Sequence, residues 1–219
     1  MRTKSLVAAA AVIAAGVASS MAQSNVYSLN VVGYVNRAIP AAAFAMVSNP
    51  LQATNNALST IFPVAPDGTS VFTWNEGAQD LDAVVPTYFT GVGWTPDITI
   101  APGQGFFALG GDNFTNTFVG EVRQGALATA IGGNAGFSAI GSQVPQGGSL
   151  TTNILAGYIP SDGDSVFTWN EGAQDLDAVV PTFFTGVGWT PDINLNVADG
   201  FFLLRVDPGV TWTRNFTVQ

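Results

Sequence analysis

One stretch of the chain occurs twice. Residues 71–98 and residues 166–193 have the same sequence except at one position, where Tyr88 in the first copy corresponds to Phe183 in the second. We call this stretch the repeated block. Repetition within a chain predicts repeated structural units. Outside the block the two halves of the chain differ widely. The near-identity therefore reflects either a surface that is used twice or recombination between the two copies.

The sequence between turn signals alternates apolar and polar residues, as β-strands do. Residues 193–197 and 210–218 alternate in this way, and turn sequences such as Asp67-Gly68 recur at short intervals. This pattern is typical of antiparallel sheets in sandwiches or barrels. Residues 56–62 and 150–155 are the segments that favour a single helical turn. We therefore predict an all-β fold with very little helix.

The repeat extends beyond the block when short gaps are allowed, so the chain divides into two β units. We place unit 1 at residues 23–118 and unit 2 at residues 119–219. Each is an antiparallel, sandwich-like or barrel-like unit that is long enough to bury its own core. Residues 114–122 are expected to serve both as the last strand of unit 1 and as the first strand of unit 2. Because no Pro/Ser-rich linker separates the units, we expect a rigid tandem arrangement.

Residues 1–22 have the features of a signal peptide. Arg2 and Lys4 form a positively charged start, residues 6–17 are mostly Ala and Val, and small residues precede Gln23. The apolar run is shorter than the ~20 residues that a membrane-spanning helix requires. We therefore expect cleavage before Gln23 and export to the periplasm, the cell surface or the extracellular space. No stable membrane insertion is expected after cleavage.

The chain is acidic and carries few charges. Six Lys and Arg residues stand against fifteen Asp and Glu residues, and no His or Cys is present. Binding to a nucleic-acid backbone requires clustered Lys and Arg, so nucleic acid is excluded as a partner. The lack of Cys fits an exported protein that relies on its hydrophobic core for stability rather than on disulfides. One cation, Arg214, falls on the apolar side of an alternating segment. We expect its head group in water at the rim of a sheet.

Several short motifs carry a resemblance to known proteins. They are VGYVN (residues 32–36), WN (residues 74–75), GW (residues 93–94) and PGQGFF (residues 102–107). The chain resembles an uncharacterised group of exported bacterial tandem-repeat all-β proteins with VGYVN, WN, GW and PGxGFF motifs. The resemblance covers nearly the whole chain after the signal peptide. It implies export and two tandem all-β units, and it implies no activity. Gln104 and Asp199 stand where the group usually has Glu.

Residue types exclude most catalytic arrangements. Without His or Cys the chain has no Ser–His or Cys–His pair, and outside the signal peptide it has no Lys to act as a base. Carboxylates remain, and Asp80 and Asp82 are close enough along a strand for glycoside hydrolysis. Both are expected to be exposed at the start of a strand, where nothing raises the pKa of one carboxyl above that of the other, as an acid and a base require. We therefore interpret them as solvated residues and expect no enzymatic activity.

The acidic turn of the block also suggests a calcium site, because calcium prefers six to eight oxygen ligands. Zinc and copper sites built from His or Cys are excluded. The candidate ligands in the two copies are Asn75, Glu76, Asp80 and Asp82, and Asn170, Glu171, Asp175 and Asp177. Their spacing does not match an EF-hand loop, so they can equally be solvated turn residues. We expect no other cofactor.

Aromatic residues in the block give a second kind of candidate site. The candidate ligand-binding or interaction residues are Trp94, Tyr88, Trp189 and Phe183. Trp94 follows a Gly-Val-Gly turn, so its ring is a better candidate for exposure than that of Trp74, and an exposed indole can stack on a sugar ring. Trp74 lies with Phe72 on one face of a strand, which is typical of core residues.

We predict an exported, non-enzymatic structural or interaction protein. Two copies of one surface on a rigid body favour repeated contacts with a cell-surface or extracellular polymer, or with other copies of the chain. The strands expected at residues 27–35 and 210–218 have edges that can pair between molecules, which would give a homo-oligomer or a filament. The alternative is a carbohydrate-binding module that uses the duplicated Trp residues.

Overall fold

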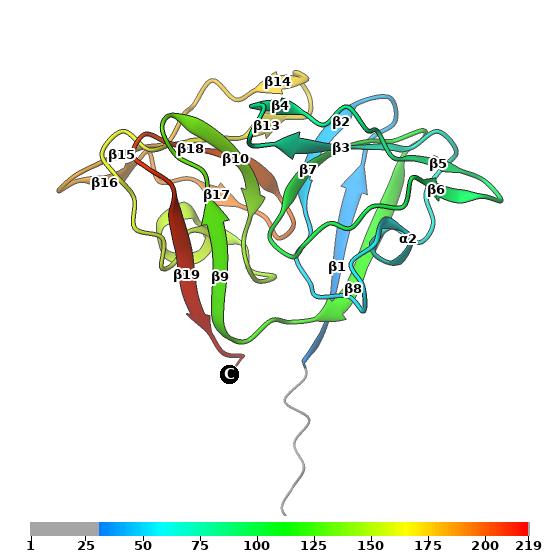
Figure 1. The fold of residues 1–219 in the computed structure, drawn as a ribbon, viewed down its shortest axis with the longest axis horizontal. Helices are drawn as coiled ribbons and strands as arrows, with labels where there is room; N and C mark the ends of the chain where they lie inside the picture. The colour runs from blue at the N-terminus through cyan, green and yellow to red at the C-terminus, as the bar shows by residue number, and fades with distance from the viewer. Residues whose placement is uncertain (1–30, 219) are drawn as a thin grey trace, which may run out of the picture. The chain divides into compact units, whose positions relative to one another are not determined.

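Antiparallel β-strands make up most of the structure, a computed structural model that describes residues 31–218 (Figure 1). The expected signal peptide and the start of the strand expected at residues 27–35 lie outside the described residues. The strands of the first half are β1 (Val32–Ile39), β2 (Phe44–Ser48), β3 (Ser70–Asn75), β4 (Asp80–Leu81), β5 (Thr87–Phe89), β6 (Gly93–Thr95), β7 (Gly105–Leu109) and β8 (Phe114–Glu121). The strands of the second half are β9 (Gly125–Ile131), β10 (Gly136–Gly141), β11 (Gly148–Ser149), β12 (Ser165–Phe167), β13 (Trp169–Asn170), β14 (Asp175–Leu176), β15 (Thr182–Phe184), β16 (Gly188–Thr190), β17 (Asn194–Leu195), β18 (Gly200–Arg205) and β19 (Val210–Phe216). The prediction of an all-β fold is confirmed.

Two helical turns are present in residues 31–218, and both lie where the sequence favours them. They are the α-helical turn α2 (Leu58–Ile61) and the π-helical turn η1 (Leu150–Ile154). A carboxylate of the block holds the start of each turn. Asp97 accepts a hydrogen bond from the Ser59 N–H at 3.0 Å, and Asp192 accepts one from the Thr151 N–H at 3.1 Å. Neither turn is long and apolar enough to cross a membrane.

Each half has one main sheet, and the two sheets have corresponding strand orders. The first has the order β2-β7-β3-β5-β6, with β4 paired to β3, and the second has the order β10-β18-β12-β15-β16. The block supplies most of β3 and all of β5 and β6 to the first sheet, and most of β12 and all of β15 and β16 to the second. Tyr88 pairs with Trp94, and Phe183 pairs with Trp189. The one substitution within the block therefore lies opposite a tryptophan in both copies.

A two-stranded ribbon accompanies each sheet. β1 pairs with β8, and β9 pairs with β19 (Figure 1). The expectation that residues 114–122 form one strand shared by both units is therefore wrong. All of β8 pairs with β1, from Phe114 opposite Ile39 to Glu121 opposite Val32, and a separate strand, β9, pairs with β19. The boundary expected between residues 118 and 119 falls inside β8.

Each half has its own core, and consecutive residues of a strand contact different cores because side chains alternate between the two faces of a sheet. Phe106 packs in the core of the first half, beside Phe62, and Phe201 packs in the core of the second half. The next residues along these strands, Phe107 and Phe202, belong to a third cluster instead. Each Phe-Phe pair therefore links the core of one half to this third cluster.

The third cluster lies between the two halves. It contains Phe44, Met46, Phe72, Trp74 and Phe107 of the first half, and Phe137, Ala139, Phe167, Trp169 and Phe202 of the second. Rings of the two halves meet edge to face, with centroid separations of 4.9 Å between Trp74 and Phe202 and 5.0 Å between Trp169 and Phe107. Each such pair contributes about 0.5–1.5 kcal/mol beyond the burial of its area.

The first copy of the block also holds the other half by hydrogen bonds to a single residue, Phe137 on β10. Trp74 Nε1 and Gln79 Nε2 donate to the Phe137 carbonyl oxygen at 2.9 and 3.2 Å. The Phe137 N–H donates to Gln79 Oε1 at 2.6 Å. Because β10 is the outermost strand of its sheet, the Gln79 amide pairs with the sheet edge as a neighbouring strand would.

The second copy makes the same contacts in the opposite direction, to Phe44 on β2. Trp169 Nε1 and Gln174 Nε2 donate to the Phe44 carbonyl oxygen at 2.9 and 3.1 Å. The Phe44 N–H donates to Gln174 Oε1 at 2.7 Å. We call these two sets of hydrogen bonds the reciprocal clasp.

Two glycines allow the halves to approach each other closely. A Cβ atom on Gly105 would lie 2.8 Å from the backbone nitrogen of Ile140, and one on Gly200 would lie 2.7 Å from the carbonyl oxygen of Val47. Side chains at these positions would push the halves apart. The third cluster, the reciprocal clasp and these glycines together place the two halves in direct contact.

Replacing Gln79 or Gln174 with Ala removes two hydrogen bonds to a sheet edge and a third to a carbonyl of its own hairpin. We expect each variant to lower the free energy of unfolding by about 1–3 kcal/mol, and the two values to be similar because the contacts are the same. Urea unfolding followed by tryptophan fluorescence measures the change. Gln52→Ala is the control, since the Gln52 side chain donates to the carbonyl of its neighbour Ala53. Changes at Gln79 and Gln174 no larger than the control would show that the clasp does not hold the halves together.

Candidate functional site

The duplicated acidic residues of the block fix the shape of a hairpin. In the first copy, Asp82 accepts hydrogen bonds from Thr73 Oγ1 at 2.7 Å and from Asn75 Nδ2 at 3.1 Å. Asp80 accepts one from the N–H of Leu81 at 2.7 Å. The second copy makes the same contacts at the equivalent positions. We call residues 74–82 and residues 169–177 the two acidic hairpins.

The expected calcium ligands do not gather into one cluster. Asn75, Asp80 and Asp82 lie together in the first acidic hairpin, as Asn170, Asp175 and Asp177 do in the second. Glu76 lies instead near Gly132 of the other half, and Glu171 pairs with Arg37. Within residues 31–218 no group of three or more acidic side chains is placed to hold a metal ion. Calcium binding therefore stays a prediction without supporting geometry.

Trp94 and Trp189 are buried, so the interpretation of Trp94 as the better candidate for exposure is wrong. They are 6% and 8% exposed, and each packs edge to face against its partner across the strands, Tyr88 or Phe183, at centroid separations of 5.6 and 5.7 Å. The Trp94 indole also donates to the Phe62 carbonyl at 2.8 Å. The Gly-Val-Gly turn before Trp94 predicted the hairpin, but the face of the strand is set by packing onto the core. Trp94 and Trp189 are therefore core residues, and Tyr88 and Phe183 are half-buried against them.

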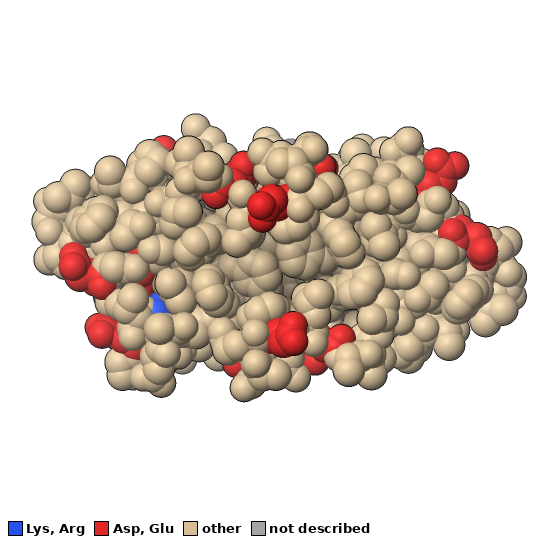
Figure 2. Space-filling model, turned by 90° about the horizontal axis from the view of Figure 1, so that it is seen from above, with Lys and Arg blue, Asp and Glu red and all other residues tan. Residues whose placement is uncertain are grey.

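Trp74 and Trp169 are the more exposed pair, and they line an aromatic hollow between the two acidic hairpins. The hollow has a volume of about 400 Å³. It is lined by Phe44, Trp74, Leu81, Phe107, Trp169, Asp175, Leu176 and Phe202. Figure 2 shows the depression in the middle of the molecule, with acidic side chains on both sides. We call it the aromatic hollow.

Both copies of the block contribute equivalent residues to the aromatic hollow. Leu81 and Leu176, which follow the acidic turns, are 39% and 40% exposed. Trp74 pairs across the hairpin with Leu81, and Trp169 with Leu176. Because the reciprocal clasp fixes both indole nitrogens, the walls of the hollow are held in position before any partner arrives. The sequence did not point to this site, since Trp74 and Phe72 share a strand face and were expected in a core.

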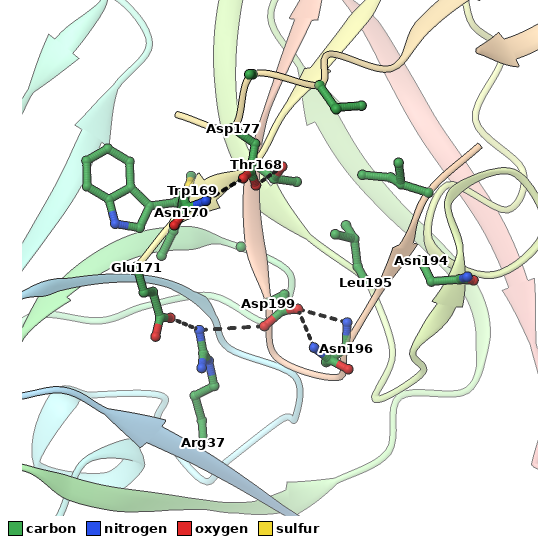
Figure 3. A pocket seen from close by; sticks show the side chains of 15 residues that line it. Arg37, Thr168, Trp169, Asn170, Glu171, Asp177, Asn194, Leu195, Asn196 and Asp199 are labelled. Carbon is green, nitrogen blue, oxygen red and sulfur yellow. Dashed lines mark hydrogen bonds and ion pairs between the residues drawn. The ribbon is translucent and has the colours of Figure 1, made fainter. Parts of the chain in front are cut away.

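A polar pocket of about 660 Å³ lies beside the second acidic hairpin (Figure 3). We call it the Arg37 pocket. The Arg37 side chain comes from β1 and forms ion pairs with Glu171 and, at 3.6 Å, with Asp199. Asp199 also accepts hydrogen bonds from the backbone and side-chain nitrogens of Asn196 at 2.8 and 3.1 Å. Trp169 of the second half contributes to the same pocket as Arg37 of the first, so both halves build it.

A smaller pocket, of about 460 Å³, occupies the equivalent place beside the first acidic hairpin. Trp74 and Glu76 line it as Trp169 and Glu171 line the Arg37 pocket. Its other polar residues differ, since Gln104 stands where the Arg37 pocket has Asp199. The block thus provides one scaffold twice, and the diverged sequence outside it gives the two pockets different chemistry.

A buried ionic cluster is present in the second half and was not expected from the sequence. Asp164 is fully buried and accepts hydrogen bonds from Tyr158 Oη at 2.7 Å and from Arg205 at 3.2 Å. The backbone N–H of Val206 donates to its other oxygen at 3.0 Å. The first half has Thr69 where the second has Asp164. This difference between the halves was the sequence feature that could have pointed to the cluster. The cluster is enclosed, and we assign it a structural role.

Arg214 is buried, which corrects the expectation that its head group lies in water. The guanidinium donates to the carbonyl of Asn153 at 2.8 Å and to Gln146 Oε1, and it lies 5.2 Å from the ring centroid of Phe216. Burial lowers the pKa of Arg214 from its usual value. Neutral oxygen acceptors in the second half solvate the charge in place of water.

Comparisons with known proteins give no family assignment. No protein-family model, curated protein or solved structure matches the chain. The function has to be argued from the geometry of the hollow and the pockets.

The ionic cluster predicts a loss of stability at high pH. Burial, followed by the hydrogen bond to Asp164, raises the pKa of Tyr158 above its usual value. An unfolded tyrosine ionises near pH 10. Each unit by which the folded pKa exceeds this value corresponds to about 1.4 kcal/mol of free energy of unfolding. The stabilisation from Tyr158 is therefore complete below about pH 10 and is lost as the pH rises toward the folded pKa. Urea unfolding between pH 8 and pH 11 measures this decline. Tyr158→Phe should make it shallower, and an unchanged slope would contradict the assignment.

Proposed function

We propose that this chain is an exported, non-enzymatic structural or interaction protein that contacts its partner through the aromatic hollow. One observation carries the proposal: two copies of the block, far apart in the sequence, supply equivalent walls of a single hollow. The partner is another copy of the chain or a cell-surface or extracellular polymer. The near-identity of the block keeps both walls the same.

The lining of the hollow is typical of a protein interaction surface. Aromatic residues are enriched at the centres of interfaces, and Trp is prominent among the residues that contribute most to binding. Here Trp74 and Trp169 line the hollow together with Leu81 and Leu176, whose side chains are exposed. The walls are fixed by the reciprocal clasp, so a partner does not have to order them, which lowers the entropic cost of binding.

The lining also favours binding over catalysis. Of the described residues that line the hollow, Asp175 alone is ionisable. Glycoside hydrolysis requires two positioned carboxyl groups with different roles, and a single carboxylate does not provide them. The missing His and Cys residues support the same conclusion.

A pair of double variants tests the hollow as the contact surface. Leu81→Gln/Leu176→Gln places polar groups at its rim. Val92→Gln/Val187→Gln is the matched control, because both valines are 76% exposed and lie elsewhere in the block. We expect the first variant to weaken self-association or binding to isolated cell envelopes at least about tenfold, as loss of two apolar contacts implies, and the control to change it less than about twofold.

Sedimentation over a concentration series measures self-association, and co-sedimentation measures binding to envelopes. Equal effects of the two double variants would show that the hollow is not the contact surface. A chain that stays monomeric and binds no envelope fraction would contradict an interaction function altogether.

Carbohydrate binding is a second candidate function, and the Arg37 pocket favours it. The pocket volume of about 660 Å³ suits a small ligand, and an aromatic ring, amides and carboxylates line it together. Glu171 and Asp199 already neutralise the Arg37 charge, so a neutral, hydroxyl-rich ligand finds both donors and acceptors. Trp169 supplies the apolar side of such a site.

The repeat offers a matched test of carbohydrate binding. Glu171→Gln alters the Arg37 pocket, whereas Glu76→Gln alters the equivalent pocket of the other half. If a glycan binds in the Arg37 pocket, Glu171→Gln should weaken its binding about tenfold or more, and Glu76→Gln should leave it unchanged. A glycan array identifies the ligand and calorimetry measures the affinity. If the unmodified chain retains no glycan on the array, this function is excluded.

A further inference from the structure

One carboxylate lines the aromatic hollow, and three more lie in the two acidic hairpins that flank it; we call these four the acidic rim. Asp175 lines the hollow, and Asp80 occupies the equivalent position in the first acidic hairpin. Asp82 and Asp177 lie in the same two hairpins and accept hydrogen bonds from hydroxyl and amide groups. Within residues 31–218 none of these four carboxylates takes part in an ion pair. Figure 2 shows acidic side chains on opposite sides of a depression in the middle of this face.

The arginines that the structure describes are held away from this rim. Arg37 pairs with Glu171 and Asp199, Arg205 pairs with Asp164, Arg214 donates to Asn153, and Arg123 donates to the Pro102 carbonyl. No Lys occurs in the described part of the chain. The acidic rim is therefore uncompensated, so a cation that approaches the hollow is attracted without displacing a cation of the chain itself.

We propose that the aromatic hollow binds a basic, apolar segment of another polypeptide, in which Arg or Lys side chains lie between large apolar residues. This inference rests on the proposed function and names the chemistry of its partner. The apolar side chains of the segment occupy the hollow, where Phe107 and Phe202 form part of the lining. Its cations lie near Asp80 and Asp175. Aromatic side chains strengthen the attraction, because guanidinium and ammonium groups bind to the faces of aromatic rings.

A second copy of this chain is a poor source of such a segment. Its described arginines are all hydrogen-bonded within the fold, and two acidic rims that face each other repel. A neutral partner would fill the apolar floor but would leave the carboxylates of the rim without a counter-charge. The combination of an aromatic floor and an acidic rim therefore selects a different, basic polypeptide.

Three peptides of one length separate charge from apolar contact. They are acetyl-Leu-Arg-Leu-Arg-Leu-amide and the same peptide with Gln or Glu in place of Arg. The purified full chain is titrated with each peptide, and calorimetry or Trp fluorescence measures the affinity. We expect the Arg peptide to bind about tenfold or more tightly than the Gln peptide, and the Glu peptide to bind more weakly still. The preference should decrease between 0.05 and 0.5 M salt, because salt screens exposed charges.

Two charge variants test where the peptide binds. Asp80→Asn/Asp175→Asn removes two rim charges and leaves a side-chain oxygen to accept the hydrogen bond from the next N–H. Asp112→Asn/Asp207→Asn is the matched control, since it makes the same change in net charge at exposed positions, and Asp112 also accepts from the next N–H. We expect the rim variant to weaken binding of the Arg peptide about fivefold or more, and the control to change it less than about twofold.

The outcomes distinguish this inference from the proposed function. If the Arg and Gln peptides bind equally and Leu81→Gln/Leu176→Gln weakens both, the hollow is a contact surface and the basic partner is wrong. If the rim variant and its control have equal effects, the charge preference is general to an acidic protein and the inference is overturned. If the Arg peptide binds and Leu81→Gln/Leu176→Gln leaves its affinity unchanged, the binding site lies elsewhere and the proposed use of the hollow fails as well. Absence of binding by the Arg peptide at millimolar concentration also overturns the inference.

Discussion

The reciprocal clasp is the interaction on which the rest of the structure depends. Each copy of the block packs one face onto the core of its own half and presents the other face to the opposite half. Gln79 and Gln174 pair with backbone groups of Phe137 and Phe44, and Trp74 and Trp169 donate to the same two carbonyls. An exposed sheet edge is prone to pair with other chains, and here a side-chain amide of the other half covers part of it.

The clasp gives a physical reason for the identity of the block residues that form it, Trp74 with Gln79 and Trp169 with Gln174. Each copy contacts a Phe residue at the equivalent position of the opposite half. A change in one copy would therefore remove hydrogen bonds from one half of the clasp and leave the other half intact. The single substitution, Tyr88 against Phe183, lies outside the clasp. Its ring packs against a tryptophan at nearly the same separation in both copies, 5.6 and 5.7 Å. The two copies of the block thus share a contact inside the molecule.

The sites of interest are consequences of this arrangement. The aromatic hollow exists because the clasp places the two acidic hairpins on either side of the third cluster. The Arg37 pocket exists because Arg37 of the first half reaches Glu171 of the second copy of the block. Outside the block the sequence has diverged, so one scaffold carries Asp199 beside one hairpin and Gln104 beside the other. This difference separates the chemistry of the two pockets.

Local sequence predicted local structure well and long-range contacts poorly. Alternation predicted strands, and the helical turns at residues 56–62 and 150–155 were found because their signals lie within a few residues. The shared strand at residues 114–122 was wrong, since pairing partners lie far away in the sequence and alternation does not identify them. Trp94 was assigned to the wrong environment because a turn predicts a hairpin but not which face of it meets a core. Asp164 and Arg214 were missed because their partners, such as Arg205 and Gln146, lie in other segments.

The sequence by itself determined the fold class, the positions of most turns and the absence of the residue types that most catalytic sites require. These properties depend on the composition and on the period-2 pattern, which a single chain displays directly. Only the tertiary structure decided that Trp74 and Trp169 are the accessible indoles and that acidic hairpins from distant segments flank one hollow. The physical reason is that strands have two faces and two edges, and what each face or edge meets is set by packing between the halves rather than by the local sequence.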